Sequence, residues 1–273
     1  MDELIKCCDE TFQNNKISEL SNPEQWPELA DCIYYELKKN SKERMFNTKI
    51  KERMTPVINT TTLSIIKVIL ATKIQLTTNF DNSIESAYEF LEYLYKITKN
   101  VTFNKPQIKC VPDFGAYSDN SRNIIYYLHG NIKDDIYILR KTHYDMYYPS
   151  VSGKGNCCIE DCLKHYFKNK SIVFIGFSFS DKYIKQYVFN LSKEIERNNM
   201  INANMFDQYG KVYTPENIRH YLLIDSENDE YKKIKDEIFN EYKDYYIYPI
   251  VYKSNKHIFI EKVFELLSQM ESS

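Results

Sequence analysis

Five side chains in this sequence carry groups that can bind or turn over a polar ligand: Asn79, Asp81, His129, Ser178 and Asp225. The amide of Asn79 and the two carboxylates can exchange hydrogen bonds with hydroxyl and amide groups. His129 carries an imidazole, a group whose pKa outside a protein environment is about 6.5, which suits proton transfer near neutral pH. Ser178 offers a hydroxyl beside an expected helix start, where backbone N–H groups attract an anionic phosphate.

Each of these side chains stands at or after the end of a short apolar run that predicts a buried strand. Three runs are regular, at residues 124–128, 172–175 and 221–224, and a less regular one covers residues 74–76. In an open α/β sheet the ligand crevice lies at the carboxyl ends of the strands. We therefore expect the five side chains at such a crevice, where a carboxylate such as Asp225 can accept hydrogen bonds from a ribose diol.

Strands and amphipathic helices alternate along most of the chain, which is typical of βαβ units. Helices are expected at residues 24–37, 62–71, 83–97, 158–167, 181–195, 230–241 and 258–270, and further strands at 136–139 and 245–251. The pattern predicts an α/β fold with a Rossmann-like, mostly parallel sheet, helices on both faces and a small helical insertion. We expect one domain over residues 1–273, with a helical N-terminal part at 1–60 and the core at 61–273. Residues 197–217 are polar and irregular and predict a surface excursion.

The same residues also have structural explanations. Asn79 and Asp81 precede an expected helix, where such residues commonly cap backbone N–H groups. A histidine after a strand is more often a structural residue than a catalyst, although Gly130 would leave the space beside the His129 imidazole open. Asp181 precedes another expected helix, and helix capping is our main interpretation of it.

Composition argues against several classes of protein. Charged residues make up 27% of the chain and the net charge is −2, so no electrostatic footprint indicates nucleic-acid binding. No stretch approaches the roughly 18 consecutive apolar residues of a membrane span. The acidic N-terminus lacks the features of a signal peptide. The seven cysteines are an odd number without secretion signals, which indicates a reduced, cytoplasmic protein.

Cys157, Cys158, Cys162 and His165 lie close together in the sequence and raise the question of a zinc site. A structural zinc ion usually takes two well-separated pairs of ligands. Here the cysteines run along one expected helix, and one face of one helix cannot enclose a tetrahedral ion. We therefore predict that they are small packing residues and that no metal is bound.

Taken in order, the polar strings resemble the sirtuin-like NAD-binding family, and its bacterial anti-phage NAD-hydrolase branch more closely than the protein deacetylases. The resemblance runs from Trp26 to the C-terminus and is carried by Thr77-Thr78-Asn79-Phe80-Asp81, His129-Gly130, Ile175-Gly176-Phe177-Ser178-Phe179-Ser180-Asp181 and Leu222-Leu223-Ile224-Asp225.

The resemblance implies a role for each matching residue. Asn79 would position the ribose of NAD or the attacking water, and His129 would act on the ribose hydroxyls as a base or hydrogen-bond acceptor. Asp81 matches a residue that grips the nicotinamide carboxamide in the deacetylase branch. The NAD-binding residues would be Thr78, Asp81, Gly176, Ser178 and Asp225.

The resemblance implies an NAD hydrolase that cleaves the nicotinamide–ribose bond with water as acceptor. NAD is then a substrate, the setting is anti-phage defence by NAD depletion, and the partner is a second copy of the chain or a sensor protein. Two alternatives remain open. One is a catalytically inactive nucleotide-binding or regulatory module, and the other is a protein deacylase, which the lack of an evident zinc module disfavours.

Sirtuins begin with a Gly-Ala-Gly-type loop that cradles the diphosphate of NAD, and this chain departs from that pattern. Its first glycine is Gly115, while the segment around Trp26 resembles the one that normally follows the loop. Either the loop has been lost or the chain begins after it. Because glycine lets backbone N–H groups approach a diphosphate closely, we predict weak NAD binding and slow turnover by this chain alone.

Overall fold

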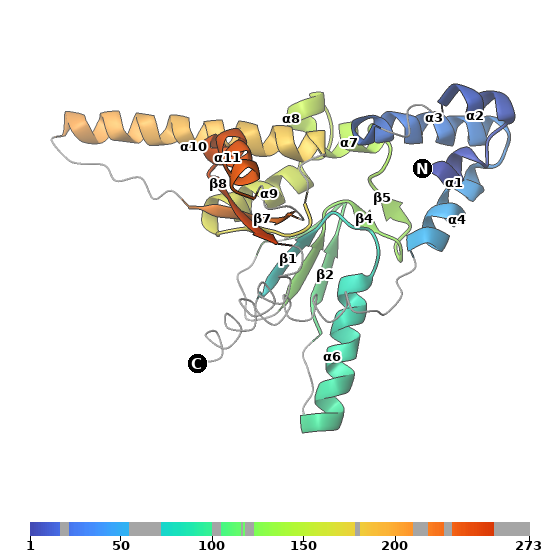
Figure 1. Ribbon diagram of the computed structural model, residues 1–273, viewed down its shortest axis with the longest axis horizontal. Helices are drawn as coiled ribbons and strands as arrows, with labels where there is room; N and C mark the ends of the chain where they lie inside the picture. The colour runs from blue at the N-terminus through green and yellow to red at the C-terminus, as the bar shows by residue number, and fades with distance from the viewer. Residues whose placement is uncertain are drawn as a thin grey trace. The chain divides into compact units, whose positions relative to one another are not determined.

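The computed structural model describes residues 1–16, 22–54, 72–99, 105–115, 117, 123–177, 181–209, 218–226 and 231–253 (Figure 1). These residues form two compact units, the first within Met1–Tyr147 and the second within Tyr148–His257. The expected helices at 62–71 and 258–270 and the candidate residue Ser178 lie outside the described residues.

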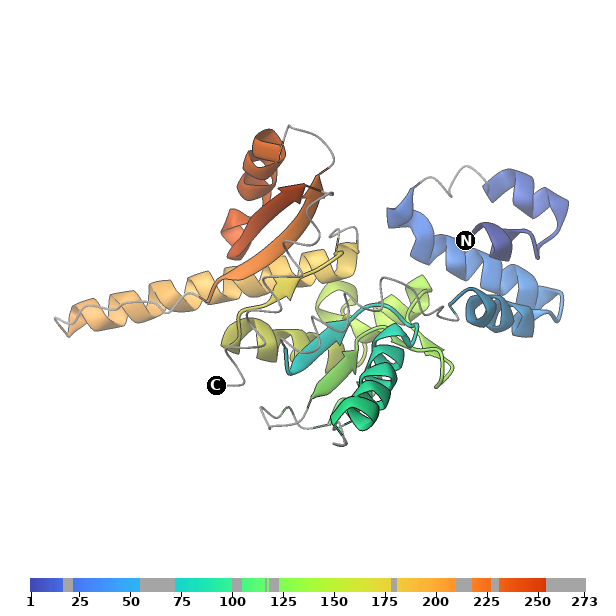
Figure 2. The same ribbon diagram turned by 60° about the horizontal axis from the view of Figure 1, so that its bottom comes forward.

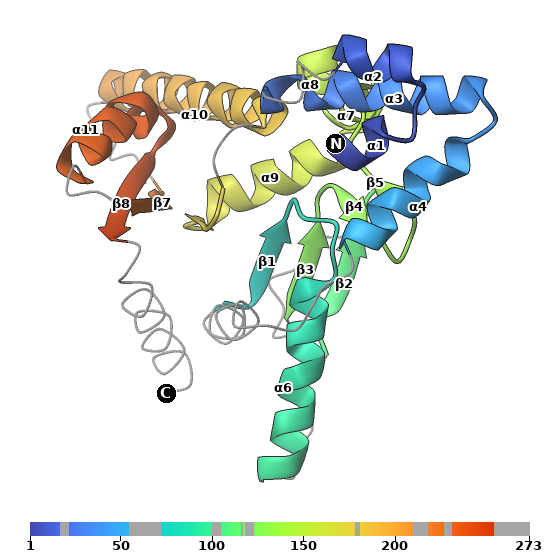
Figure 3. The ribbon, with the colours of Figure 1, turned by 45° about the vertical axis from the view of Figure 1, so that its right-hand side comes forward.

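A three-stranded parallel sheet forms the centre of the first unit. Its strands are β1 (Ile74–Thr77), β2 (Gln107–Cys110) and β3 (Ile124–Tyr127), in the order β1-β3-β2. Figure 3 shows β3 between its two neighbours. All four residues of β3 have side chains with 0% exposure. A continuous apolar run is typical of a strand that is buried on both faces, as the sequence predicts.

Helix α6 (Ser83–Lys99) covers this sheet and confirms the helix expected at residues 83–97. Its apolar face recurs at helical spacing, and Ala87, Tyr88 and Leu91 pack against Ile125 and Tyr127 of β3.

The N-terminal part of the first unit is helical. It contains α1 (Asp2–Ile5), α2 (Glu10–Lys16), the 3₁₀ turn η2 (Pro23–Gln25), α3 (Trp26–Lys39) and α4 (Glu43–Met54). Ile33 and Phe46 belong to a core that includes Tyr137, and Phe80 packs against that core. The helices therefore support the segment that follows β1.

A short antiparallel hairpin and one further helix complete the first unit. The hairpin consists of β4 (Gly130–Asn131) and β5 (Ile136–Tyr137), and it leads to α7 (Lys141–Tyr147). Asp31 of α3 holds the start of α7, because its carboxylate accepts hydrogen bonds from the Thr142 N–H and Oγ1 at 2.8 and 2.9 Å.

The second unit is built around another parallel sheet, β6-β7-β8, formed by β6 (Val173–Phe174), β7 (His220–Ser226) and β8 (Ile247–Lys253). Its helices are α8 (Pro149–Ser152), α9 (Cys158–Asn169), α10 (Lys182–Gln208), α11 (Tyr231–Tyr242) and the 3₁₀ turn η3 (Lys243–Tyr245). In Figure 2, α10 extends well past β7 and β8. Parallel strands alternating with helices confirm the predicted α/β, Rossmann-like fold.

Two local predictions were wrong. Residues 197–208 continue α10 instead of forming an irregular excursion. They contain neither glycine nor proline, so nothing stops a helix whose backbone hydrogen bonds are satisfied internally. Strand β7 runs from His220 to Ser226, so Asp225 lies within the strand and not after it.

Among the described residues, none of the helices is both long enough and apolar enough to cross a membrane.

Candidate functional site

The segment after β1 carries Thr78, Asn79 and Asp81 and is fixed by short local hydrogen bonds. The Asn79 N–H donates to Oγ1 of Thr77 at 3.1 Å. Oδ1 of Asp81 accepts the N–H of Ser83 at 2.8 Å, where α6 begins. Asp81 therefore has the capping role that its position allows. Asn79 is exposed, and Thr78 and Asp81 are half-buried.

The segment after β3 runs beside the one after β1. The two strands are parallel neighbours, with Thr77 opposite Tyr127. Two backbone hydrogen bonds continue the pairing: Leu128 N–H donates to the Thr77 carbonyl and Ile132 N–H to the Phe80 carbonyl, each at 2.9 Å. Asn79 and His129 lie between these two bonds along the chain. Each is the second residue after its strand, Asn79 after β1 and His129 after β3. The structure therefore brings these two predicted residues to one place at the sheet edge.

His129 is buried at this edge of the sheet. Its side chain is 3% exposed, and its ring meets the Tyr144 ring edge-to-face with centroids 5.3 Å apart. Its carbonyl accepts the N–H of Ile138 at 2.7 Å, so the hairpin also fixes its backbone.

The expectation that Gly130 leaves an open space beside His129 was wrong. Gly130 has φ +91°, and a Cβ built there would lie 1.9 Å from the carbonyl oxygen of Ile136. The opposite strand of the hairpin fills the space. Glycine is therefore required at this position for close backbone approach.

A buried polar cluster lies next to this edge, and the sequence analysis missed it. Oε1 of Glu85 accepts a hydrogen bond from Nδ2 of Asn131 at 2.8 Å, and Nζ of Lys133 donates to Oε2. Glu85 and Asn131 are 5% and 1% exposed. The pKa of Tyr127 is raised, mainly by burial and secondly by the nearby Glu85 carboxylate. The cluster ties α6 to the hairpin that follows His129.

Lys133→Met is expected to lower the free energy of unfolding by about 1–3 kcal/mol, because it leaves the buried Glu85 carboxylate without its cation. Urea denaturation measures the change. The matched control is Lys49→Met, which breaks the exposed Lys49–Glu52 ion pair and should cost no more than about 0.5 kcal/mol. Equal losses in the two variants would show that the buried carboxylate does not depend on Lys133.

Gly176 and Asp181 lie on the second unit, at the turn between β6 and α10. Gly176 has φ +62°, and none of the described residues comes within 4 Å of its Cβ position, so its backbone conformation explains the glycine. Oδ1 of Asp181 accepts the N–H groups of Tyr183 and Ile184 at 2.9 and 3.1 Å. The prediction of a helix cap at Asp181 is confirmed. Two N–H donors of this helix start are thus already satisfied, which leaves fewer of them for a phosphate.

Asp225 lies on the neighbouring strand β7, opposite Tyr252 of β8. β6 pairs with β7 through Val173 and Phe174, opposite Tyr221 and Leu222. Because the strands are parallel, Gly176 and Asp225 both lie toward the carboxyl edge of the second sheet.

Cys158 and Cys162 lie on α9, as expected, but Cys157 is the exposed residue that precedes this helix, so the prediction that it is a packing residue was wrong. Sγ of Cys157 donates to Oδ2 of Asp161 at 2.8 Å just before α9, and this bond raises the pKa of the Cys157 thiol. Cys162 is 0% exposed and belongs to the packed interior. In the described part of the chain, no group of three or more His, Cys, Asp or Glu side chains is arranged to hold a metal ion.

The model of a family described as "SIR2-like domain" matches residues 73–250. This span starts just before β1, ends within β8 and includes all seven residues predicted for the site. No curated protein matches the chain.

Proposed function

We propose a function from one premise: this chain belongs to the SIR2-like domain family, whose members use NAD. We infer that it hydrolyses the bond between nicotinamide and ribose in NAD, with water as the acceptor. The observation that supports the proposal is the position of Asn79 and His129 after two neighbouring parallel strands of the first sheet, in segments joined by backbone hydrogen bonds.

The reaction sets clear demands on these two side chains. When the bond from the nicotinamide nitrogen to the ribose carbon breaks, its electron pair leaves with nicotinamide, and positive charge develops on the ribose. Water then adds its oxygen to that carbon and loses a proton, which gives ADP-ribose. The exposed amide of Asn79 can orient the ribose or the water, and the imidazole of His129 can hold the hydroxyl proton.

The remaining site residues are assigned to holding NAD. We assign Asp81 to the nicotinamide carboxamide and Thr78 to the same end of the substrate. Gly176 and Ser178 are assigned to the phosphates and Asp225 to the adenosine ribose. The helix dipole favours an anion near Gly176, although the Asp181 cap competes for the same N–H groups.

We also propose a biological setting in the cytoplasm, namely anti-phage defence by depletion of NAD. Support for this comes from the likeness of the Gly176–Asp181 string to the bacterial anti-phage branch. Activity in this setting would be controlled by self-association or by a sensor protein.

Incubation of the purified chain with NAD tests the proposal. Nicotinamide and ADP-ribose are expected in equal amounts, measured by chromatography, and an acetyl-lysine peptide should not accelerate their release. A second candidate is an inactive NAD-binding module, favoured because no glycine precedes Gly115. Calorimetry separates the two: binding of NAD without release of nicotinamide would establish the module and reject the hydrolase. Dependence of the release on the peptide would instead indicate a deacylase.

A further inference from the structure

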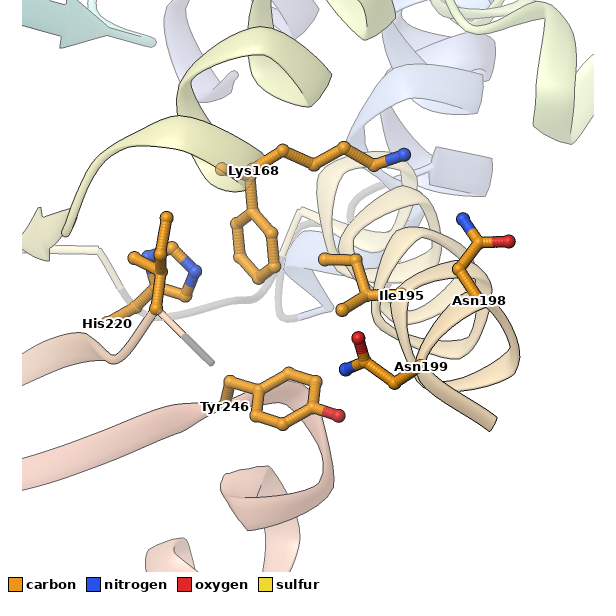
Figure 4. A pocket seen from close by; sticks show the side chains of 8 residues that line it. Lys168, Ile195, Asn198, Asn199, His220 and Tyr246 are labelled. Carbon is orange, nitrogen blue, oxygen red and sulfur yellow. The ribbon is translucent and has the colours of Figure 1, made fainter. Parts of the chain in front are cut away.

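Helix α10 leaves the packed part of the second unit about halfway along its length. Its buried residues lie between positions 183 and 192. The hollow drawn in Figure 4 marks the transition, since Ile195 and Asn199 line it from the helix and Tyr246 lines it from the segment before β8. Beyond the hollow, each of the residues from 200 to 209 is exposed. The end of α10 therefore lies outside the core of this unit.

The exposed end of α10 carries large apolar side chains at helical spacing. Ile201 is 46% exposed, Met205 is 52% exposed, and Tyr209, which directly follows the helix, is 76% exposed. Residues four positions apart lie on one face of a helix, so these three side chains form a single line, which we call the distal stripe. Single exposed apolar residues are common on protein surfaces, but a contiguous group of them is typical of an interaction surface.

The sequence of this segment does not favour a helix that stands alone in water. Four of the residues from 198 to 204 are asparagines, which are weak helix formers. The stability of most helices in proteins comes from the packing of one apolar face. A molecule that covers the distal stripe would therefore stabilise the helical form of the segment.

The distribution of charge favours a second copy of the chain as that molecule. Residues 182–197 include six charged side chains, whereas residues 198–209 include one, Asp207. Asp207 stands two positions from Met205 and does not share its face of the helix. Two copies of the distal stripe can therefore meet without like-charge repulsion, while an acidic or basic partner would find no counter-charge on it.

We propose that two copies of the chain associate through the distal stripe, with the two helices antiparallel about a two-fold axis beside Met205. A two-fold interface joins the same patch on both copies. Met205 then meets Met205 of the partner subunit, and Ile201 lies near Tyr209 of the partner subunit. Side chains four positions apart form a ridge that packs into the groove of a facing helix, and the adaptable methionine side chain suits the centre of such a contact.

Two features favour the antiparallel arrangement over a parallel one. Antiparallel helices place the positive end of one helix dipole near the negative end of the other. The first half of each α10 is packed within its own unit, and antiparallel pairing through the far ends places these two packed halves at opposite ends of the contact. A parallel pair would bring them side by side.

The size of the stripe predicts a weak, reversible dimer. Stable specific interfaces bury about 1,200–2,000 Å² in total, and smaller ones are typical of transient contacts. The exposed end of α10 is only about 15 Å long and about 10 Å wide, so its contact falls below that range. We therefore expect a Kd on the order of 10–100 µM. The association requires no NAD, so its test is independent of the proposed function.

Sedimentation velocity of the full chain from about 5 to about 500 µM spans the expected Kd, and the average mass should rise from that of one chain toward that of two. Met205→Glu places two carboxylates together at the axis and should weaken the association at least about tenfold. The matched control is Met146→Glu, because Met146 of α7 is 51% exposed, much as Met205 is. This control should associate as the parent does.

An exchange of charge tests the antiparallel register. Met205→Lys should be as deficient as Met205→Glu when each variant is alone. An equal mixture of the two should associate at least about tenfold more tightly than either, because position 205 meets itself across the axis. Circular dichroism checks that each variant is folded, and Ile201→Glu disrupts the same stripe if a change at Met205 unfolds the chain.

Three results would overturn the proposal. They are a parent chain that stays monomeric over the whole concentration range, a folded Met205→Glu variant that associates as Met146→Glu does, and a mixture of the two charged variants that stays monomeric. The first result would assign the distal stripe to a different protein, and the third would reject the contact of position 205 with its own copy.

Discussion

Asn79→Ala and His129→Ala are each expected to reduce the release of nicotinamide from NAD at least about a hundredfold. A positioned proton acceptor typically contributes a factor of 10² to 10⁴ to the rate, and an orienting group that acts on the same ribose has an effect of similar size. The rate is measured by chromatography of nicotinamide at saturating NAD. Loss of either residue should lower kcat more than it raises KM, because both groups act mainly in the transition state.

The two variants should differ in stability, which separates a catalytic loss from unfolding. Asn79 is exposed, and Asn79→Ala should melt as the parent does. His129 is buried against Tyr144, and its replacement should cost about 0.5–3 kcal/mol. Asn40→Ala, a change at an exposed asparagine after α3, is the control and should keep the parental rate. If both site variants remain folded and still release nicotinamide at that rate, the site assignment is wrong.

Gly130→Ala is expected to lower the free energy of unfolding by more than about 3 kcal/mol. The added Cβ would lie 1.9 Å from the Ile136 carbonyl oxygen, and the residue has φ +91°. Backbone on both sides of the hairpin would have to move, and an incompatible backbone conformation adds to the cost. Urea denaturation measures the loss, and a tryptic digest shows whether the hairpin opens.

Gly176→Ala is the matched control, since Gly176 also has a positive φ, of +62°, but among the described residues no atom lies within 4 Å of its Cβ position. Its free energy of unfolding should fall only by the cost of the left-handed conformation, about 1–2 kcal/mol. Similar losses in both variants would mean that the hairpin adapts to the extra atom. The close approach of Ile136 would then not be what demands glycine at position 130.

The sequence predicts the fold class because its strongest patterns are physical requirements of that class. Strand β3 is buried on both faces, so all of its residues are apolar and it is easily recognised. Strand β2 was missed because it is an edge strand with two exposed residues, and Lys109 interrupts its apolar pattern. The length of α10 was missed because its second half has few buried residues to produce a helical period.

The candidate site was predictable where a motif is contiguous and not where it depends on the fold. Asn79 and His129 stand in short strings after strands, and the strand register brings them together. The contact between Glu85 and Asn131 joins residues 46 positions apart, and no local pattern reveals such a pair. One signal was present: Glu85 precedes Tyr88 by one helical turn on the buried face of α6, where a carboxylate needs a partner.

The strand order of the first sheet also determines when that sheet can form during synthesis. β3 is the central strand, yet of the three it leaves the ribosome last. Until residues 124–127 have emerged, β1 and β2 have no central strand to pair with, and their apolar side chains remain open to other chains. The long loops that must close before pairing also slow the process. A nascent chain that stalls before β3 is thus exposed to aggregation. Asn79 and His129 can come together only after β3 has emerged and paired with β1.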